Sequence, residues 1–584
     1  MNALLLLAVT SVGYVVAYHT YGRFLARKIF KLEPNAPVPS KTFADGQEYI
    51  ESDKQILFGH HFTSIAGTGP IVGPAIGVIW GWIPAIVWVF FGSILMGTVH
   101  DFSTLVISMR NQGKSISEIS ERYINRRVRA LFFCVVFLAI LIVIAIFGLV
   151  IAIIFAQFPQ AVFPVWAQIP IAMLLGVAVF KRGGNLIPLT GVAVVVMIGS
   201  VVWGATMPIT MTTVGGIPPT GMWTIILLAY AYIASVLPVN VLLQPRDYIN
   251  AWQLYIALGF VISGIIVTSV TIGLPISTPA VDLNPVGAPN IWPFLFITIA
   301  CGAISGFHCL ISSGTTSKQI KNETDAQFIG YGAMITESFL ATIIIIAVTA
   351  GISIAYKAPS GEILTGLSAW KAHYGSWTAS SGLGSKLTAV VVGCANMMKS
   401  IGISLPIGTA IMGVFIASFA GTTLDSATRV QRYIISEFFS KTQFKRLSNK
   451  WIATGLAVST AAILAFSSGA NGTGALALWP MFGAVNQLLG GLALLVATAY
   501  LRQKGGLKWL ITALPCGFLM GITLWASWLN QIQFSQEGNL FLMSINGLIM
   551  ILAIVIAIET GIVLIRGARK VSDNVTETVK INNK

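Results

Sequence analysis

Apolar residues occur along this chain in long runs that polar segments interrupt at intervals. The run Ala130–Phe155, for example, contains neither a charged residue nor a proline. About 20 helical residues cross a bilayer, and a helix satisfies every backbone N–H and C=O group within its own segment. The alternating strands of about ten residues that are typical of an outer-membrane barrel are not seen. The pattern predicts an all-α, polytopic membrane protein with about 15 transmembrane helices.

The polar segments between the predicted spans are mostly short. The spans are expected at residues 3–21, 57–80, 84–109, 130–157, 166–181, 186–207, 221–243, 251–273, 292–313, 328–355, 404–436, 450–468, 474–500, 508–529 and 541–565. The longest connection, 357–403, includes a weakly apolar stretch, Lys386–Ser400. We expect this stretch to form an external helix across the mouth of the bundle. The residues after Arg569 form a polar tail.

The positions of the charged residues indicate how the chain is oriented in the membrane, and they do not indicate binding to nucleic acid. Hydrophobic residues make up 55% of the chain and charged residues 9%, against roughly 25% charged in soluble domains. If the N-terminus lies outside, all but four of the 35 Lys and Arg residues fall on the cytoplasmic side, as the positive-inside rule requires. The four exceptions are Lys357, Lys371, Lys386 and Lys399. We therefore expect membrane lipid as a partner, a cytoplasmic C-terminus and no nucleic acid.

Two glycine-rich interruptions fall in corresponding places of two halves of the chain. The first is Ser64–Pro70 and the second is Cys301–His308. Paired glycine- or proline-interrupted segments are typical of transporters built from inverted repeats, although small residues also allow close helix packing. The expected units are residues 1–56 (first helix and connector), 57–207 (first five-helix repeat), 208–291 (two inserted helices), 292–500 (second repeat with the external loop 357–403) and 501–584 (two peripheral helices and a tail).

Several longer motifs resemble a known family. They are Leu57–Phe62, Gly67–Pro74, His100–Phe102, Pro245–Tyr248, Pro293–Gly302, Ser305–His308, Ser312–Thr316, Gly330–Gly332, Glu337–Ser338 and Leu478–Pro480. Over about residues 14–500 the chain resembles the carbon starvation protein A (CstA) family. That resemblance implies a LeuT-like 5+5 inverted-repeat core related to the amino acid–polyamine–cation superfamily. It also implies a bacterial inner-membrane transporter for peptides or pyruvate, used in nutrient scavenging under carbon starvation. The external loops here are shorter than in better-known members, and His100 stands where those have Gln.

The first interruption is a candidate site for a carboxylate. Pro70 suits the first turn of a resumed half-helix, whose N-terminus offers free N–H donors and partial positive charge. Peptides and pyruvate both carry a carboxylate. The predicted substrate-binding residues are Gly67, Thr68 and Gly69, with Gly302, Ser305 and His308 opposite them. The alternative for Ser305 and His308 is a hydrogen bond between helices.

Two carboxyl groups are candidates for ion coupling, because ionisable residues at membrane depth are costly. Glu337 lies inside a predicted span and could exchange a proton; the alternative is a neutral carboxyl bonded to a neighbouring helix. Asp425 follows Thr422 and Thr423, and this trio could serve a proton or a small hard cation such as sodium. The alternative for Asp425 is an ion pair with Arg429, four residues later on the same helix face.

Three histidines and one aspartate lie near the cytoplasmic ends of adjacent predicted spans. They are His60, His61, His100 and Asp101, and a gating hydrogen-bond network is the preferred interpretation. A metal site formed by His61, His100 and Asp101 is the alternative. His60 and His61 point about 100° apart around a helix, so at most one of them easily shares a site with His100.

The absence of several sequence motifs argues against an ATP-driven pump and against an enzyme. The chain has no GxxxxGK[ST] motif for ATP and no G-x-S-x-G or H-E-x-x-H arrangement, so we expect neither an enzyme nor a cofactor. The sequence predicts a secondary active importer of peptides or a small carboxylate, driven by protons. The alternatives are sodium-coupled uptake of another small organic acid or amino acid, and a nutrient sensor that does not transport.

Overall fold

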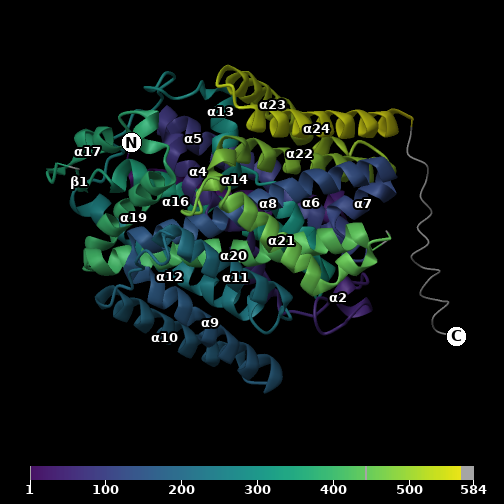
Figure 1. The fold of residues 1–584 in the computed structure, drawn as a ribbon, viewed down its shortest axis with the longest axis horizontal. Coiled ribbons are helices and arrows are strands. Elements are labelled where there is room, and N and C mark those ends of the chain that lie inside the picture. The colour runs from purple at the N-terminus through teal and green to yellow at the C-terminus, as the bar shows by residue number, and fades with distance from the viewer. Residues whose placement is uncertain (1, 359, 441–442, 567–584) are drawn as a thin grey trace.

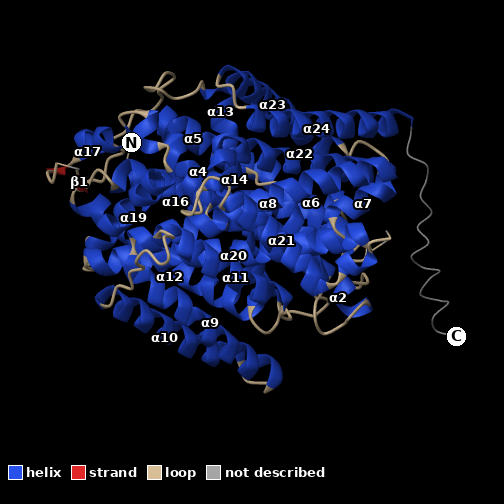
Figure 2. Cartoon of the chain, viewed as in Figure 1, coloured by secondary structure: helices blue, strands red, loops and turns tan. Residues whose placement is uncertain are grey.

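The computed structural model describes residues 2–358, 360–440 and 443–566, which form a bundle of helices (Figures 1 and 2). The tail predicted beyond Arg569 lies outside the described residues. The helices of the first part are α1 Ala3–Ala17, α2 Pro39–Thr42, α3 Lys54–Ala66, α4 Gly69–Gly77, α5 Trp82–Val87, α6 Thr98–Met109, α7 Ile116–Tyr123, α8 Arg126–Gln157, α9 Val162–Gly176 and α10 Leu186–Thr206. The central helices are α11 Pro219–Val236, α12 Leu243–Thr271, α13 Ile291–Thr298, α14 Ala300–Ala303, α15 Phe307–Gly314 and α16 Gly332–Ile346. The last helices are α17 Gly366–Tyr374, α18 Trp377–Ser380, α19 Leu383–Lys399, α20 Leu405–Phe439, α21 Lys450–Ala465, α22 Trp479–Gln503, α23 Leu510–Gln536 and α24 Leu540–Arg566.

Every predicted span corresponds to a helical segment. Among the described residues, twelve helical stretches are long and apolar enough to cross a membrane, and a bent pair, Lys54–Ala66 with Gly69–Trp80, makes a thirteenth. Of the two remaining predictions, 292–313 is divided among α13, α14 and α15, and 450–468 is the 16-residue helix α21. The prediction of about fifteen helices is therefore confirmed as an approximate number.

The boundaries of the helices follow from local signals in the sequence. The side chain of Asn125 accepts a hydrogen bond from the Val128 N–H at 2.9 Å and begins α8, while Ser115 caps α7 in the same way. The short amphipathic helix α7 occupies part of the loop 110–129. Helices α7 and α8 therefore begin directly after a polar residue whose side chain caps the helix N-terminus.

The molecule has two polar ends. Figure 1 shows α17 and β1 at one end and α2 and α7 at the other, with α9 and α10 along one edge and α23 and α24 along the opposite edge. The short strands β1 Tyr356–Lys357 and β2 Ile363–Leu364 pair antiparallel, and the rest consists mostly of helices joined by loops (Figure 2). The segment 357–403 thus marks one end, and the connector 32–53 marks the other.

The helix expected at Lys386–Ser400 is present as α19 and is not among the candidate spans. Instead of lying on the surface, α19 packs against α4, α12 and α20. Most of its side chains are buried, including that of Lys386, which is 4% exposed. The segment therefore brings a lysine into the helix bundle.

Candidate functional site

The first glycine-rich interruption is a break between α3 and α4. Gly67 has φ +49°, a left-handed conformation that favours glycine, and the two half-helices meet at 43°. A Cβ atom at Gly67 would overlap the hydroxyl of Thr423 on α20. The break predicted within Ser64–Pro70 is present between Ala66 and Gly69, and it lies against α20.

The second interruption separates α14 from α15 at Ile304–Gly306. Ile304 is extended, with φ −160° and ψ 88°, and the freed backbone finds partners on α22. The Gly306 N–H donates to the Asn486 carbonyl at 3.0 Å, and the Asn486 side-chain oxygen accepts from the Phe307 N–H at 3.0 Å and the Ser305 hydroxyl at 3.2 Å. Ser305 therefore bonds a neighbouring helix in this conformation. Sequence reasoning missed Asn486.

The two breaks lie against each other. A Cβ atom at Gly69 would overlap that of Cys301, and one at Gly73 would lie 2.7 Å from the Thr298 carbonyl oxygen. Gly302 faces Pro74. Glycine is needed at these positions because α4 crosses α13 and α14 with their backbones close together.

A cavity of about 570 Å³ begins at this crossing and extends toward the end that carries segment 357–403. Its lining residues come from α4, α8, α13, α14, α18, α19, α22, α23 and the polar connections. They are Thr68, Gly69, Val72, Gly73, Ile76, Ile146, Phe147, Gly287, Ala288, Pro289, Phe294, Ile297, Thr298, Cys301, Trp377, Ser381, Lys386, Trp479, Pro480, Phe482, Gly483, Asn530 and Gln533. Of the predicted substrate-binding residues, Thr68 and Gly69 line this cavity, and Gly67, Gly302, Ser305 and His308 do not.

His308 and Glu337 form a buried pair behind the breaks. His308 Nε2 lies 3.1 Å from Glu337 Oε2, at ion-pair distance but without the geometry of a directed hydrogen bond. Both side chains are completely buried. The ring of His100 lies 6.5 Å from that of His308, and neither nitrogen of His100 has a hydrogen-bond partner among the described residues. Three proton-carrying side chains are thus enclosed together.

His61 and Asp101 form a second buried pair that continues this cluster. His61 Nε2 lies 3.0 Å from Asp101 Oδ2, and its Nδ1 lies 2.8 Å from the hydroxyl of Thr316. The other carboxylate oxygen of Asp101 accepts a hydrogen bond from Ser312. The pair and its Ser312 contact join α6 to α3, which ends at the first break, and to α15, which begins after the second.

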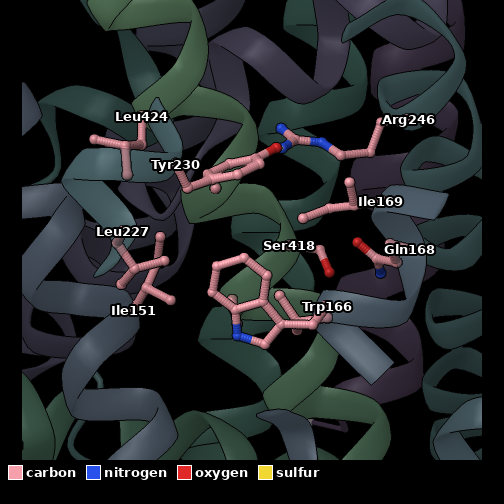
Figure 3. Close-up of a pocket in the computed structure, with 12 residues that line it drawn as sticks. Ile151, Trp166, Gln168, Ile169, Leu227, Tyr230, Arg246, Ser418 and Leu424 are labelled. Carbon is pink, nitrogen blue, oxygen red and sulfur yellow. The ribbon is translucent and has the colours of Figure 1, made fainter. Parts of the chain in front are cut away.

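Asp425 belongs to a different, more highly bonded network. It accepts hydrogen bonds from Arg246 and, at 3.0 Å, from the Tyr230 hydroxyl. Arg246 also donates to Thr422 at 3.0 Å. Figure 3 shows the Tyr230 hydroxyl directed toward the Arg246 guanidinium beside a small cavity of about 20 Å³. That volume holds about one water molecule, so this is no substrate cavity.

His60 joins the Arg246 network and not the His61 pair. His60 Nδ1 lies 2.6 Å from Asp247 Oδ2, and the other oxygen of Asp247 accepts from Thr422 at 3.0 Å. The predicted gating residues are therefore divided among separate contacts, as the different directions of His60 and His61 suggested. The described residues contain no group of three or more His, Cys, Asp or Glu side chains placed to hold a metal ion, so the metal alternative gains no support.

The end that carries the connector is closed by ion pairs. Glu48 accepts hydrogen bonds from Arg429 at 3.1 Å, from Arg432 at 2.6 Å and from Tyr433. Burial alone would raise the pKa of Glu48, but the two guanidinium groups outweigh it and lower the pKa below its usual value. Arg429 therefore pairs with Glu48 and not with Asp425, which corrects the alternative drawn from its spacing.

Comparison with known proteins gives the following matches. A family model described as "Carbon starvation protein CstA" matches residues 2–526. "Peptide transporter CstA" of Campylobacter jejuni is 32% identical over 578 residues, which cover 92% of this chain and 82% of that protein. "Pyruvate/proton symporter BtsT" of Escherichia coli is 31% identical over 597 residues, which cover 90% of this chain and 81% of that protein.

A solved structure shares the arrangement of the helices. A crystal structure of the Eremococcus coleocola manganese transporter superposes with a TM-score of 0.53 at 12% sequence identity, covering 90% of this chain and 99% of that one. At this identity the likeness concerns the fold alone. It confirms the LeuT-like fold class.

Proposed function

This chain belongs to the carbon starvation protein CstA family, and from that premise we propose that it imports a small solute bearing a carboxylate, peptide or pyruvate, together with protons. It is a secondary active transporter in a multi-pass membrane fold. The relatives whose names specify a substrate divide between peptides and pyruvate. The substrate and the coupling ion of this chain are inferred from its own cavity and buried groups.

The observation that carries the proposal is the cavity at the two broken helices. Its volume of about 570 Å³ lies within the usual range of small-molecule sites. Thr68 and Gly69, at the start of α4, belong to its wall. The partial positive charge at a helix N-terminus favours an anion. A carboxylate is the substrate group that this wall suits best.

Proton coupling is assigned to His308 and Glu337. Imidazole and carboxyl groups are side chains that can accept and release protons. The two side chains are 3.1 Å apart and lie on α15 and α16, directly behind the second break. A proton taken up by the pair changes the net charge of a site without solvent. Such a change alters which conformation is favoured, and this is how an ion gradient drives alternating access.

Among the described residues, the cavity and the ion pairs of Glu48 lie toward opposite ends of the molecule. The cavity extends toward segment 357–403, while Glu48, Arg429 and Arg432 close the other end. With the N-terminus outside and the C-terminus in the cytoplasm, this is an outward-open state in the bacterial inner membrane. We propose that residues 57–207 and 292–500 are the two repeats that move relative to each other.

Sodium coupling is the second candidate, and one contact favours it. The Thr423 hydroxyl donates to the Ser64 carbonyl at 3.3 Å, so oxygens of α3 and α20 meet beside the first break. Oxygen ligands suit a hard cation. However, Thr422 and Asp425 already bond Arg246, whose positive charge disfavours a cation nearby.

Uptake into proteoliposomes tests the proposal. We expect labelled pyruvate or alanyl-alanine to accumulate under an inward proton gradient and to equilibrate without accumulation when the gradient is absent. Accumulation under an inward sodium gradient alone would transfer the coupling to sodium. If neither solute accumulates under either gradient while one of them still binds, the transport proposal is wrong and the sensor alternative is favoured.

The proposed orientation has its own test. A single cysteine introduced at Lys371 should react with a membrane-impermeant maleimide in intact cells, whereas one at Arg446 should react only after the cells are opened. The reverse labelling pattern would invert the topology and make the described state inward-open.

A further inference from the structure

Lys386 is a basic side chain that the fold places inside the cavity without an acidic partner among the described residues. Its side chain lines the cavity although the residue is only 4% exposed. The described residues provide it with neither an ion pair nor an acceptor, and its ammonium lies 5.0 Å from the centroid of the Trp479 ring. The other lysines of the segment 357–403, Lys357, Lys371 and Lys399, are exposed.

A buried ammonium of this kind is costly unless something compensates for it. Burial lowers the pKa of Lys386 to about 7, and no charged neighbour opposes this effect. A cation–π contact recovers only part of the lost hydration. A carboxylate entering the cavity would supply the missing counter-charge and a charge-assisted hydrogen bond.

The charge balance of the cavity wall also discriminates between substrates. Among the described residues that line it, Lys386 is the one charged side chain, and no Asp or Glu is present. The remaining polar side chains are those of Thr68, Thr298, Ser381, Asn530 and Gln533, with the thiol of Cys301 and the indole N–H groups of Trp377 and Trp479. A peptide would bring an ammonium group for which this wall has no counter-charge, whereas a monocarboxylate brings none.

We propose that Lys386 is the binding residue for the carboxylate of the substrate, and that the cavity selects small organic monocarboxylates over zwitterionic peptides. The start of α4, at Thr68 and Gly69, faces the same cavity and provides a second favourable environment for the anion. The proposal rests on the transport function proposed above and names its substrate class.

Binding measurements on the purified full-length protein, without a gradient, test this assignment. Wild-type protein should bind pyruvate at least tenfold more tightly than methyl pyruvate, which lacks the charge, or alanyl-alanine. Lys386→Met should weaken pyruvate binding about tenfold or more, the loss expected for one charge-assisted hydrogen bond, and should remove the preference over the ester. Lys386→Arg should keep the preference, and the matched control Lys399→Met, on the exposed face of α19, should change nothing.

A second measurement does not depend on whether the variants fold. Reductive methylation of wild-type protein, read by mass spectrometry, should modify Lys386 more slowly when pyruvate is present, with Lys399 as the unaffected internal reference. The proposal is overturned if pyruvate leaves the Lys386 rate unchanged, or if Lys386→Met retains the preference for pyruvate over its ester.

These outcomes separate the two proposals. Proton-driven accumulation of alanyl-alanine without pyruvate binding would overturn the role of Lys386 and leave the transport proposal intact. Pyruvate binding that depends on Lys386, without accumulation under any gradient, would do the opposite.

Discussion

The molecule contains two buried carboxylates that sequence reasoning treated alike, Glu337 and Asp425, and their surroundings differ. Asp425 is bonded to Arg246 and to Tyr230. Glu337 faces only His308, at 3.1 Å, and neither of its oxygens makes a directed hydrogen bond with another described residue. Asp425 is held by two hydrogen-bond donors, whereas the nearest side chain to the Glu337 carboxyl is the titratable imidazole of His308.

The partner decides what each carboxylate can do. Arginine remains protonated in proteins, so loss of the Asp425 charge would leave a buried guanidinium without its nearest counter-charge. Histidine is the side chain that most readily gains and loses a proton near neutral pH. The Arg246–Asp425 pair is therefore suited to holding helices α12 and α20 together, and the His308–Glu337 pair to exchanging a proton.

Among the substitutions considered, Arg246→Met should lower the stability of the protein most. Removing one partner of a buried ion pair costs about 3–5 kcal/mol, because the other charge stays buried. We expect a large loss of folded protein after heating in detergent, measured by size-exclusion chromatography. The double variant Arg246→Met/Asp425→Asn should recover much of that loss.

The matched control for Arg246→Met is Arg127→Met. Arg127 is 85% exposed and lies 3.8 Å from Glu559, and an exposed pair of this kind contributes about 1 kcal/mol or less. If the two single variants unfolded at the same temperature, the Arg246 network would not be a main contributor to stability.

Glu337→Gln should abolish proton-driven accumulation of the substrate without stopping its exchange. The amide keeps the shape of a protonated carboxyl but cannot release a proton. With one proton carried per substrate, a pH difference of one unit allows about tenfold accumulation, and the variant should reach only the external concentration. Downhill exchange of labelled substrate should continue in proteoliposomes.

The exposed residue Glu362, on the segment 357–403, gives the control Glu362→Gln, which should accumulate substrate as the wild type does. Undiminished accumulation by Glu337→Gln would remove Glu337 from the coupling step and direct attention to Asp101 and His61.

Local features of this fold were predictable from the sequence, and the contacts between distant segments were not. The apolar runs predicted the helices, and the glycines at 67, 69 and 306 predicted the two breaks, because these signals lie within a few residues of the feature they determine. The partner of Asp425 was wrongly sought four residues away at Arg429. It lies on α12, at Arg246, since the packing of α12 on α20 decides the pairing.

In the candidate site, too, the contacts between distant residues could not be predicted from the sequence. His308 and Glu337 were each named as functional from their depth in a predicted span, but nothing in the sequence placed them beside each other. Asn486 was missed because an asparagine next to Gln487 in an apolar helix gives no sign of which distant backbone it will bond. Lys386 did carry a signal, as one of four lysines on the side where the positive-inside rule disfavours them. Only the structure separates this buried lysine from its three exposed neighbours.

Replacing His100 should have the smallest effect on stability. Its side chain is buried like those of Asp425 and Glu337, but it has neither fixed donors nor a paired group among the described residues. Neither of its ring nitrogens is bonded among the described residues, although the side chain is fully buried. Replacing an unsatisfied buried polar group by an apolar one is nearly neutral or stabilising, so His100→Leu should leave stability unchanged or raise it by about 1 kcal/mol. His61→Leu, which removes the contacts with Asp101 and Thr316, should lower stability.

Thermal unfolding of these two variants in detergent, together with uptake by each, resolves the role of His100. A His100→Leu protein that is stable and still accumulates substrate would restrict the proton-exchanging group to His308 and Glu337. A stable protein that has lost accumulation would show that His100 finds its partner in the opposite conformation of the transport cycle. In that case the ring 6.5 Å from His308 would be the next position for the proton after Glu337 releases it.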